Sequence, residues 1–319
     1  MRETQDTAPP GILVAGESLI DIVEHQGREP VEHVGGCPAN VALGLARLGN
    51  PVELRTWFGS DTRGERIRAW LETDGVIISA GSQGANRTST AHARIDAAGA
   101  ADYVFDFAYD VPDVDPVRPP AHIHIGSISA IREPGATKTM GMLEEFAPTA
   151  TISYDPNVRP QVMPDPVESR RRVEALIKRV DVVKISDEDI SWLSPDEDVA
   201  ETLHAWLMLG PALVILTRGA EGSLALSAGG AKVSVPATLV TVADTVGAGD
   251  SFMAGLIDGL AHAGLLGTHQ REALRAIDED TLREVLQRAA TIAAITVSRA
   301  GANPPTAEEL TLTPLRPVP

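Results

Sequence analysis

Apolar runs typical of buried strands alternate with amphipathic helical patterns along most of this chain. An apolar run at 11–16 precedes a small-residue helical pattern at 38–48, which Gly49 is expected to end, and the same order returns at 52–58 and 63–74. The alternation continues with expected strands at 122–125, 151–154, 180–185 and 212–217 and expected helices at 135–146, 167–179 and 198–209. Strands and helices in this order predict a mostly parallel sheet with helices on both faces.

Two segments break this rhythm, because their polar and apolar residues alternate with a period of two. Residues 22–34 and 89–107 therefore predict a small antiparallel sheet outside the main one, which we expect to form a lid. The expected core comprises residues 1–21, 35–88 and 108–319. Within it, residues 224–235 predict a hairpin that turns at Gly229-Gly230, and the alanine-rich stretch 282–299 predicts a closely packed helix.

The composition is that of a globular protein, with 43% hydrophobic and 22% charged residues among 319. A formal net charge of −17 disfavours nucleic acid and anionic membranes as partners, since both attract basic surfaces. Cys37 is the single cysteine, which excludes an intrachain disulfide and a cysteine-based zinc site. Neither an apolar leader after Met1 nor an apolar run of about 18 residues occurs, so we expect a cytoplasmic protein.

The segment 244–250, which reads DTVGAGD, precedes a helical pattern rich in alanine, glycine and leucine. Gly247, Ala248 and Gly249 leave backbone N–H groups uncovered at the start of that helix, which is a favourable position for a phosphate group. Asp250 would repel phosphate, but it is well placed to take a proton from a hydroxyl group that attacks a phosphoryl group. From these residues alone, a first-turn aspartate favoured by the helix dipole explains Asp250 equally well.

A second glycine motif gives the chain its resemblance to a known family. Residues 35–42 read GGCPANVA and resemble the first signature of the ribokinase (PfkB) family of carbohydrate kinases, and residues 244–257 resemble its second signature. Segments 16–21 and 299–302 extend the resemblance over nearly the whole chain, whereas the Walker and GxGxxG motifs do not occur. The resemblance implies an α/β fold, a ribokinase-like three-layer sandwich with a mostly parallel central sheet and a small β-sheet lid.

The resemblance also implies the chemistry: ATP as phosphate donor, Mg²⁺ with it, and the K⁺ site that many members have. Asp250 would be the general base, and the amides of Gly247, Ala248 and Gly249 would form an anion hole for the transferred phosphoryl group. The implied sugar-binding residues are Asp21, Gly35, Gly36, Asn40, Asn157 and Arg159. The implied ATP-binding residues are Lys184, Ser186, Thr217, Gly219 and Gly222. The implied metal ligands are Asp189, through water to Mg²⁺, and Asp244 with the carbonyl of Val246, to a monovalent cation.

Several of these residues also have ordinary structural explanations. Asp21 fits a turn or helix cap, Asn40 fits a hydrogen bond to local backbone, and Arg159 fits a surface salt bridge. Cys37, which lies between the sugar-binding positions, is expected only to fill space.

The segment 184–189, KISDED, departs from the Asn-x-x-Glu motif that the family has at this place. Ser186 and Asp189 replace the amide and the longer carboxylate, which puts the magnesium role in doubt. A serine helix cap followed by first-turn acids explains the same residues. His122 and His124 share one face of an expected strand, where local hydrogen bonds are the ordinary role of a histidine.

The form of the two motifs most resembles the fructokinase branch of the family. The segment Pro38-Ala39-Asn40 and the loop 155–159, which reads DPNVR, imply phosphorylation of D-fructose to fructose 6-phosphate. 2-Keto-3-deoxygluconate kinase and ribokinase remain alternatives, and a catalytically silent sugar-binding protein is the alternative from another class. Because the lid would have an exposed β edge, the expected partners also include a second copy of the chain in a homodimer.

Overall fold

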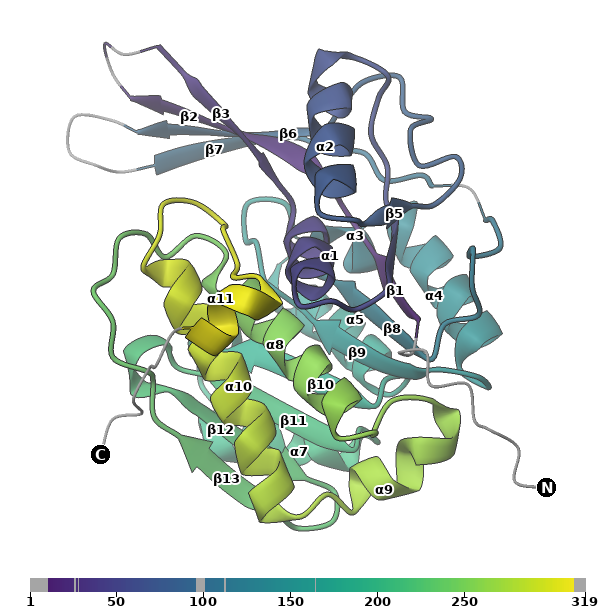
Figure 1. The fold of residues 1–319 in the computed structure, drawn as a ribbon, viewed down its shortest axis with the longest axis vertical. Coiled ribbons are helices and arrows are strands. Elements are labelled where there is room, and N and C mark those ends of the chain that lie inside the picture. The colour runs from purple at the N-terminus through teal and green to yellow at the C-terminus, as the bar shows by residue number, and fades with distance from the viewer. Residues whose placement is uncertain are drawn as a thin grey trace.

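The structure is a computed structural model that describes residues 11–25, 27, 29–95, 101–111, 113–163 and 165–312. The strands of its main sheet are β1 (Ile12–Ala15), β4 (Val52–Arg55), β5 (Ile77–Ile78), β8 (His122–Gly126), β9 (Thr151–Asp155), β10 (Val182–Ser186), β11 (Leu213–Thr217), β12 (Ser223–Ser227) and β13 (Lys232–Val235). They lie in the order β13-β12-β11-β10-β9-β8-β1-β4-β5 (Figure 1). Every neighbouring pair from β5 to β11 is parallel, and only β12 and β13 run antiparallel to their neighbours. The predicted mostly parallel sheet is confirmed.

Helices cover both faces of this sheet. One face packs against α1 (Cys37–Arg47), α2 (Thr62–Thr73), α8 (Ala248–His262), α9 (Arg271–Arg275) and α10 (Glu279–Val297). The other packs against α3 (Ser127–Ile131), α4 (Gly135–Phe146), α5 (Pro166–Ile177), α6 (Asp187–Leu193) and α7 (Val199–Met208). The remaining described helices are α11 (Ala307–Leu312) and the 3₁₀ turns η1 (Gly219–Glu221) and η2 (Thr268–Gln270). The result is a three-layer sandwich.

Strand periodicity explains how one sheet serves two cores. Ile12 and Val14 of β1 belong to the cluster on the α8 side, whereas Leu13 and Ala15 belong to the cluster on the opposite side. The sequence boundaries are close to those observed, although the strand expected at 52–58 already ends at Arg55. Among the described residues, no helix is both long and apolar enough to cross a membrane.

The second sheet is small and lies beside the ends of the main one (Figure 1). Its strands are β2 (Leu19–His25), β3 (Val31–Gly35), β6 (Thr90–Ile95) and β7 (Ala101–Asp106), in the order β3-β2-β6-β7. The prediction of an antiparallel sheet is wrong for one pair, because β2 and β6 are parallel. The long connection between them, which includes β4 and α2, returns the chain in the same direction, as a parallel pair requires.

The small sheet reaches further into the sequence than the expected lid segments do. Its first strand, β2, begins at Leu19, and its second, β3, ends at Gly35. Asp21 therefore lies within β2, opposite His33 of β3 and Ala91 of β6. Gln26, Arg28 and residues 96–100 of the expected lid lie outside the described residues.

The last third of the chain is organised by the contact between α8 and α10. A Cβ atom at Gly255 would lie 2.8 Å from the Cα of Ala289, so glycine is needed for this close approach. The predicted hairpin and the predicted alanine-rich helix are both confirmed, as β12–β13 and α10. This packing fixes the N-terminus of α8 at the carboxyl edge of the parallel strands.

Candidate active site

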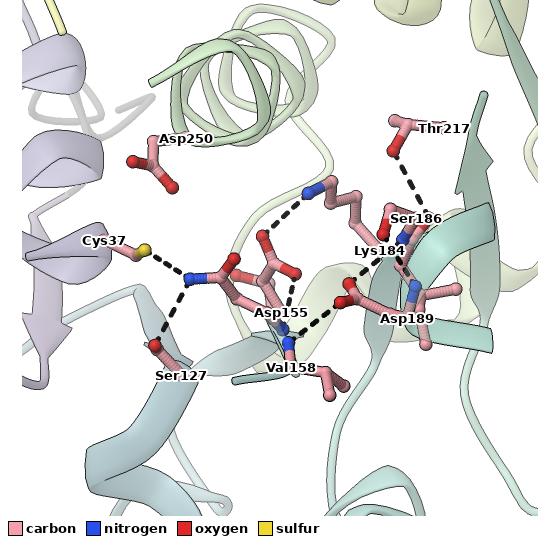
Figure 2. Close-up of polar contacts among 12 residues, drawn as sticks. Cys37, Ser127, Asp155, Val158, Lys184, Ser186, Asp189, Thr217 and Asp250 are labelled. Atoms are coloured by element: carbon pink, nitrogen blue, oxygen red, sulfur yellow. Dashed lines mark hydrogen bonds and ion pairs between the residues drawn. The ribbon is translucent and has the colours of Figure 1, made fainter. Parts of the chain in front are cut away.

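The candidate site lies where the carboxyl ends of β9 and β10 meet the beginnings of α1 and α8. Asp155 is the last residue of β9, Ser186 is the last of β10, and Asp250 stands in the first turn of α8. Ligands of open parallel sheets bind at this edge. Figure 2 shows Asp250, Asp155, Lys184 and Cys37 around one space, with Asp189 to its side.

The N-terminus of α8 is built by a left-handed glycine. Gly247 is the N-cap with φ of 75°, and a Cβ atom there would lie 2.7 Å from the Cβ of Ala302. The Ala248 N–H donates to the carbonyl of Thr245 at 3.2 Å. The N–H groups of Gly247, Gly249 and Asp250 donate to none of the described residues. Of the three amides expected to be uncovered, Ala248 is therefore engaged in a turn, and the other two are available to an anion.

Asp250 is a buried carboxylate with incomplete compensation. Asp250 is only 7% exposed, and among the described residues its side chain accepts one hydrogen bond, from the Asn40 amide at 2.7 Å. Burial raises the pKa of Asp250 to about 6, against the opposing effects of the Asn40 hydrogen bond and of Lys184 and Arg159. Such a carboxylate is ionised near neutral pH and still accepts a proton readily, as a general base must.

Asp21 is a second carboxylate directed at the same space. Burial raises the pKa of Asp21 to about 6, the charge of Arg159 lowers it, and the charge of Asp250 raises it again. A Cβ atom at Gly35 would lie 2.0 Å from Asp21 Oδ2, so only glycine leaves room for this carboxylate. Gly36, with φ of 109°, is the N-cap of α1 and places Asn40 in its first turns.

Lys184 brings a buried positive charge to the start of α8. Its ammonium donates to Asp155 Oδ2 at 2.9 Å, and both side chains are only 5% exposed (Figure 2). A Cβ atom at Gly249 would lie 3.1 Å from Lys184 Nζ, so this ammonium faces the backbone of the glycine loop. Sequence reasoning named Lys184 but gave Asp155 no role, although its place at a strand end was a usable signal.

The loop after β9 is tied to the start of α1. Asn157, at φ of 41°, donates its side-chain amide to Ser127 Oγ at 3.2 Å and also contacts Cys37 Sγ. Arg159 lies with Nη2 3.8 Å from the same sulfur. Burial, followed by the charge of Asp250, raises the pKa of the Cys37 thiol well above its usual value, so the thiol is neutral. From the sequence, Cys37 was expected only to fill space. In the structure its sulfur also contacts Asn157 and Arg159, two expected sugar-binding residues.

The first turn of α6 contains the helix cap that the sequence left open. Ser186 Oγ accepts from the Asp189 N–H at 3.0 Å, and Asp189 returns the contact to the Ser186 N–H at 3.4 Å. Asp189 Oδ1 also accepts from the Val158 N–H at 2.9 Å, and burial raises the pKa of Asp189 (Figure 2). Within the described ranges, no group of three or more His, Cys, Asp or Glu could hold a metal ion by itself.

Three of the expected ATP-binding residues lie at and just after the carboxyl end of β11. Thr217 ends β11 and contacts the carbonyl of Ile185, while Gly219 and Gly222 frame η1 with positive φ values of 48° and 87°. Among the described residues, no hydrogen bond joins these three to Asp250. A separate open groove is lined by Leu239, Val240, Thr241, Ala243 and Ser298.

Asp244 shapes the loop that leads into α8. Its oxygens accept from the N–H groups of Val246 at 3.0 Å and Gly301 at 2.8 Å, and these bonds lower the pKa of Asp244. The carboxylate is therefore ionised, and the backbone of the 244–247 loop is folded around it.

Sequence reasoning missed one further buried acid near the sugar-binding residues. Glu17 is 2% exposed and accepts from Ser129 Oγ at 2.7 Å and from the Ser129 N–H at 3.3 Å. It thereby ties the first strand's end to α3. Its position inside the segment 16–21, which resembles the family, was the available signal.

The chain thus combines a nine-stranded, mostly parallel α/β sandwich, a small accessory sheet and an aspartate in the first turn of a glycine-capped helix. The model of the pfkB family carbohydrate kinases matches residues 11–309, and the chain belongs to that family. It is therefore an ATP-dependent carbohydrate kinase.

Individual relatives agree with this assignment. A fructokinase of Rhizobium leguminosarum bv. trifolii is 33% identical over 288 residues, which cover 85% of either chain. The crystal structure of a fructokinase from Xylella fastidiosa with bound ATP is 25% identical, with a TM-score of 0.81 over 95% of this chain and 97% of that one. An aminoimidazole riboside kinase from Salmonella enterica shares the fold at 22% identity and a TM-score of 0.76, over 95% and 99% of the two chains.

Proposed function

We propose that this protein is a fructokinase that transfers the γ-phosphate of ATP to D-fructose and forms fructose 6-phosphate. The observation that carries the proposal is the position of Asp250, a buried and incompletely compensated carboxylate in the first turn of α8, beside uncovered amides and the Lys184 ammonium. A fructokinase at 33% identity supports the choice of sugar. 2-Keto-3-deoxygluconate and ribose are the alternative acceptors.

In the proposed reaction, Asp250 accepts the proton of the sugar hydroxyl while the hydroxyl oxygen bonds to the γ-phosphorus. The bond from that phosphorus to the bridging oxygen breaks, and ADP leaves with the electron pair. The amides of Gly247 and Gly249 stabilise the negative charge on the transferred group, with Ala248 joining them if its turn opens. The Lys184 ammonium adds a positive charge at the same place, next to Gly249.

The sugar would lie between Asp21, Asn40 and the loop that carries Asn157 and Arg159. Asn40 donates its amide to Asp250, and its Oδ1 is buried without a partner among the described residues, so it is free to accept from a sugar hydroxyl. The carboxylate of Asp21 suits two neighbouring hydroxyls, and glycine at positions 35 and 36 leaves room for that carboxylate and for the backbone of Glu17.

The nucleotide would extend from the glycine loop across Ser186, Thr217, Gly219 and Gly222. The exposed apolar side chains of Leu239, Val242 and Val246, near the groove described above, suit an aromatic base. The residues present fit a Mg²⁺ ion held chiefly by ATP phosphates and water, with Asp189 reaching it through water, since Asp189 already binds two N–H groups. This ion would neutralise phosphate charge, and a K⁺ ion near Asp244 and the Val246 carbonyl would support the glycine loop.

The proposal is tested by a coupled ADP-release assay with ATP, Mg²⁺ and K⁺. The acceptor panel is fructose, ribose, 2-keto-3-deoxygluconate, adenosine and fructose 6-phosphate. We expect the highest kcat/KM for fructose. A preference for another acceptor would contradict fructose and keep the phosphotransfer mechanism. If ATP binds but no acceptor is phosphorylated, the silent sugar-binding alternative is favoured.

Two further expectations belong to the same proposal. The first is a homodimer in which the small sheets of two copies pair, which light scattering of the purified chain measures; a monomer at assay concentration would contradict it. The second is a cytoplasmic location, which fits the supply of ATP and is tested by fractionation of cells that express the chain.

A further inference from the structure

A seam of polar side chains crosses the face of the main sheet that packs on α8. On this face β1 and β10 present the aliphatic residues Ile12, Val14 and Val182. Between them, β8 and β9 present only polar side chains, each at most 3% exposed: His122, His124, Thr151, Ser153 and Asp155. Burying five polar side chains in an aliphatic layer costs stability unless they are paired, so each of them needs a hydrogen-bond partner.

Four of these side chains, those of Thr151, His122, Ser153 and His124, form one continuous chain of hydrogen bonds. The Gly267 N–H donates to Thr151 Oγ1 at 3.1 Å, and Thr151 Oγ1 lies 3.0 Å from His122 Nδ1. Ser153 Oγ then bridges the two rings, at 2.8 Å from His122 Nε2 and 3.0 Å from His124 Nδ1. The chain runs along the strands from the loop before α9 toward the carboxyl edge of the sheet.

The far end of this chain lies near the Asp155–Lys184 ion pair. A Cβ atom built on Gly126 would lie 3.6 Å from His124 Nε2 and 3.8 Å from the Cβ of Asp155, so Nε2 and the Asp155 side chain both lie next to this glycine. Burial, then the charge of Lys184, lowers the pKa of His124 to about 3, while the Ser153 backbone opposes this. Burial and His124 lower the pKa of His122 to about 3 as well. Both rings are therefore neutral, and each has a single N–H.

The hydrogen bonds of this chain can all be donated in one direction or all in the other. The groups around the chain favour one of these two directions. The Thr151 hydroxyl has a carbonyl acceptor, Ala121, at 3.3 Å, so His122 Nδ1–H can donate to Thr151. Ser153 O–H then donates to His122 Nε2, and His124 Nδ1–H donates to Ser153. With this direction of donation, His124 Nε2 carries no proton, and its lone pair is attracted by the positive charge of Lys184. The opposite direction would turn an N–H toward that ammonium, which is repulsive.

We propose that His124 is a positioning residue for phosphoryl transfer: its Nδ1–H tautomer, fixed through Ser153, His122 and Thr151, turns the unprotonated Nε2 toward the Asp155–Lys184 ion pair and holds the ammonium beside Gly249. The effect on catalysis rests on the proposed function, whereas the tautomer does not. The seam is thus the support that keeps a buried lysine in place at the end of two strands.

The tautomer is measured directly by long-range ¹H–¹⁵N correlation spectra of the full chain labelled with ¹⁵N-histidine. Spectra of His122→Gln and His124→Gln assign the two residues among the 8 histidines of the chain. We expect both rings as Nδ1–H tautomers, with nitrogen shifts that do not change between pH 5 and 8. An Nε2–H tautomer at His124, or titration of this ring in that range, would overturn the proposal whatever the enzyme phosphorylates.

The positioning role is measured with ATP, by calorimetric affinity and by kinetics. In His124→Leu we expect ATP binding to weaken about tenfold and kcat to fall with it, while KM for the sugar stays unchanged, because a displaced cation affects the phosphates first. His124→Gln, which keeps a polar group on the Nε2 side, should recover part of this loss. Unchanged ATP affinity and kcat in His124→Leu would contradict the role.

A matched control and a milder variant guard against a purely structural effect. Thr202→Val removes another buried hydroxyl, on α7 at the opposite face of the sheet, and should leave ATP affinity unchanged. If His124→Leu does not fold, Ser153→Ala breaks the same chain with little loss of volume. Ser153→Ala is expected to weaken ATP binding in the same direction, and equal affinity in Ser153→Ala and Thr202→Val would overturn the proposal.

Discussion

Two buried aspartates lie on the same helix and have opposite surroundings. Asp258, near the end of α8, is fully buried and forms an ion pair with Arg288, while Asn50 donates to its Oδ1 at 2.7 Å. Asp250, in the first turn, receives one hydrogen bond from Asn40, and burial raises its pKa to about 6. One carboxylate is compensated by a cation from α10, and the other is left partly uncompensated.

This difference suggests that Asp258 has a structural role and Asp250 a chemical one, although both lie on α8. The Asp258 carboxylate pairs with Arg288 and joins α8 to α10, and breaking a buried pair of this kind is strongly destabilising. A carboxylate with too few partners destabilises the fold when it is ionised, and for that reason it binds a proton readily. The active site is therefore expected where the chain tolerates an unfavourable charge, and each experiment below alters one of the two aspartates or the hydrogen-bond donor of Asp250.

The largest effect is expected from Asp250→Asn. The amide keeps the shape of the side chain but accepts no proton, so kcat in the ADP-release assay should fall by roughly 10² to 10⁴, the usual contribution of a general base. ATP affinity, measured by calorimetry, should stay within about threefold, because the amides of the glycine loop remain. A kcat close to that of the unmodified protein would show that Asp250 is not the base.

The second effect concerns Asp258→Asn and falls on stability. An amide in place of the carboxylate leaves Arg288 without its ion-pair partner, so urea unfolding should show a loss of about 3 kcal/mol. The kcat of the folded protein should stay within about twofold, since Asp258 is two turns away from the site. A loss of activity without a loss of stability would mean that the two aspartates are not functionally distinct.

The sequence predicted the position of Asp250 at the start of a helix, because the signals for that structure are local. The turn at Gly247, the uncovered amides and the start of α8 all lie within residues 247–250. Strand and helix periodicity likewise predicted most of the main sheet, since each βαβ unit is defined by neighbouring residues.

Contacts between distant segments could not be predicted in the same way. The parallel pairing of β2 with β6 depends on the whole connection between them, and periodicity gives no information on the partner of a strand. The Lys184–Asp155 ion pair arises only because β10 lies next to β9 in the sheet. At Ser186 the family motif and a helix cap call for similar residue types, and the structure shows the capping box.

A third, smaller effect is the stability of Asp250→Asn as a function of pH. The raised pKa means that Asp250 contributes stability fully below its unfolded value of 3.8, and that this contribution is lost as pH rises through about 6. At pH 8 the variant, which carries no charge there, should therefore be more stable than the unmodified protein, by about 2 kcal/mol in urea. At pH 4 the two proteins should unfold at similar urea concentrations. A variant that is less stable at pH 8 would contradict the uncompensated state of Asp250.

The smallest effect is expected from Asn40→Ala, which removes the one hydrogen bond that Asp250 accepts. In the unmodified protein, kcat/KM should fall below pH 6, tenfold for each further pH unit, as Asp250 becomes protonated. Because the Asn40 amide stabilises the ionised carboxylate, its loss should move this acid limb upward by about one pH unit, the equivalent of one hydrogen bond to a charged group. Loss of a sugar contact alone would lower kcat/KM equally at all pH values. The displacement of the limb therefore reports on the surroundings of Asp250 itself, and an unmoved limb would assign the titration near pH 6 to another group, with Asp21 the first candidate.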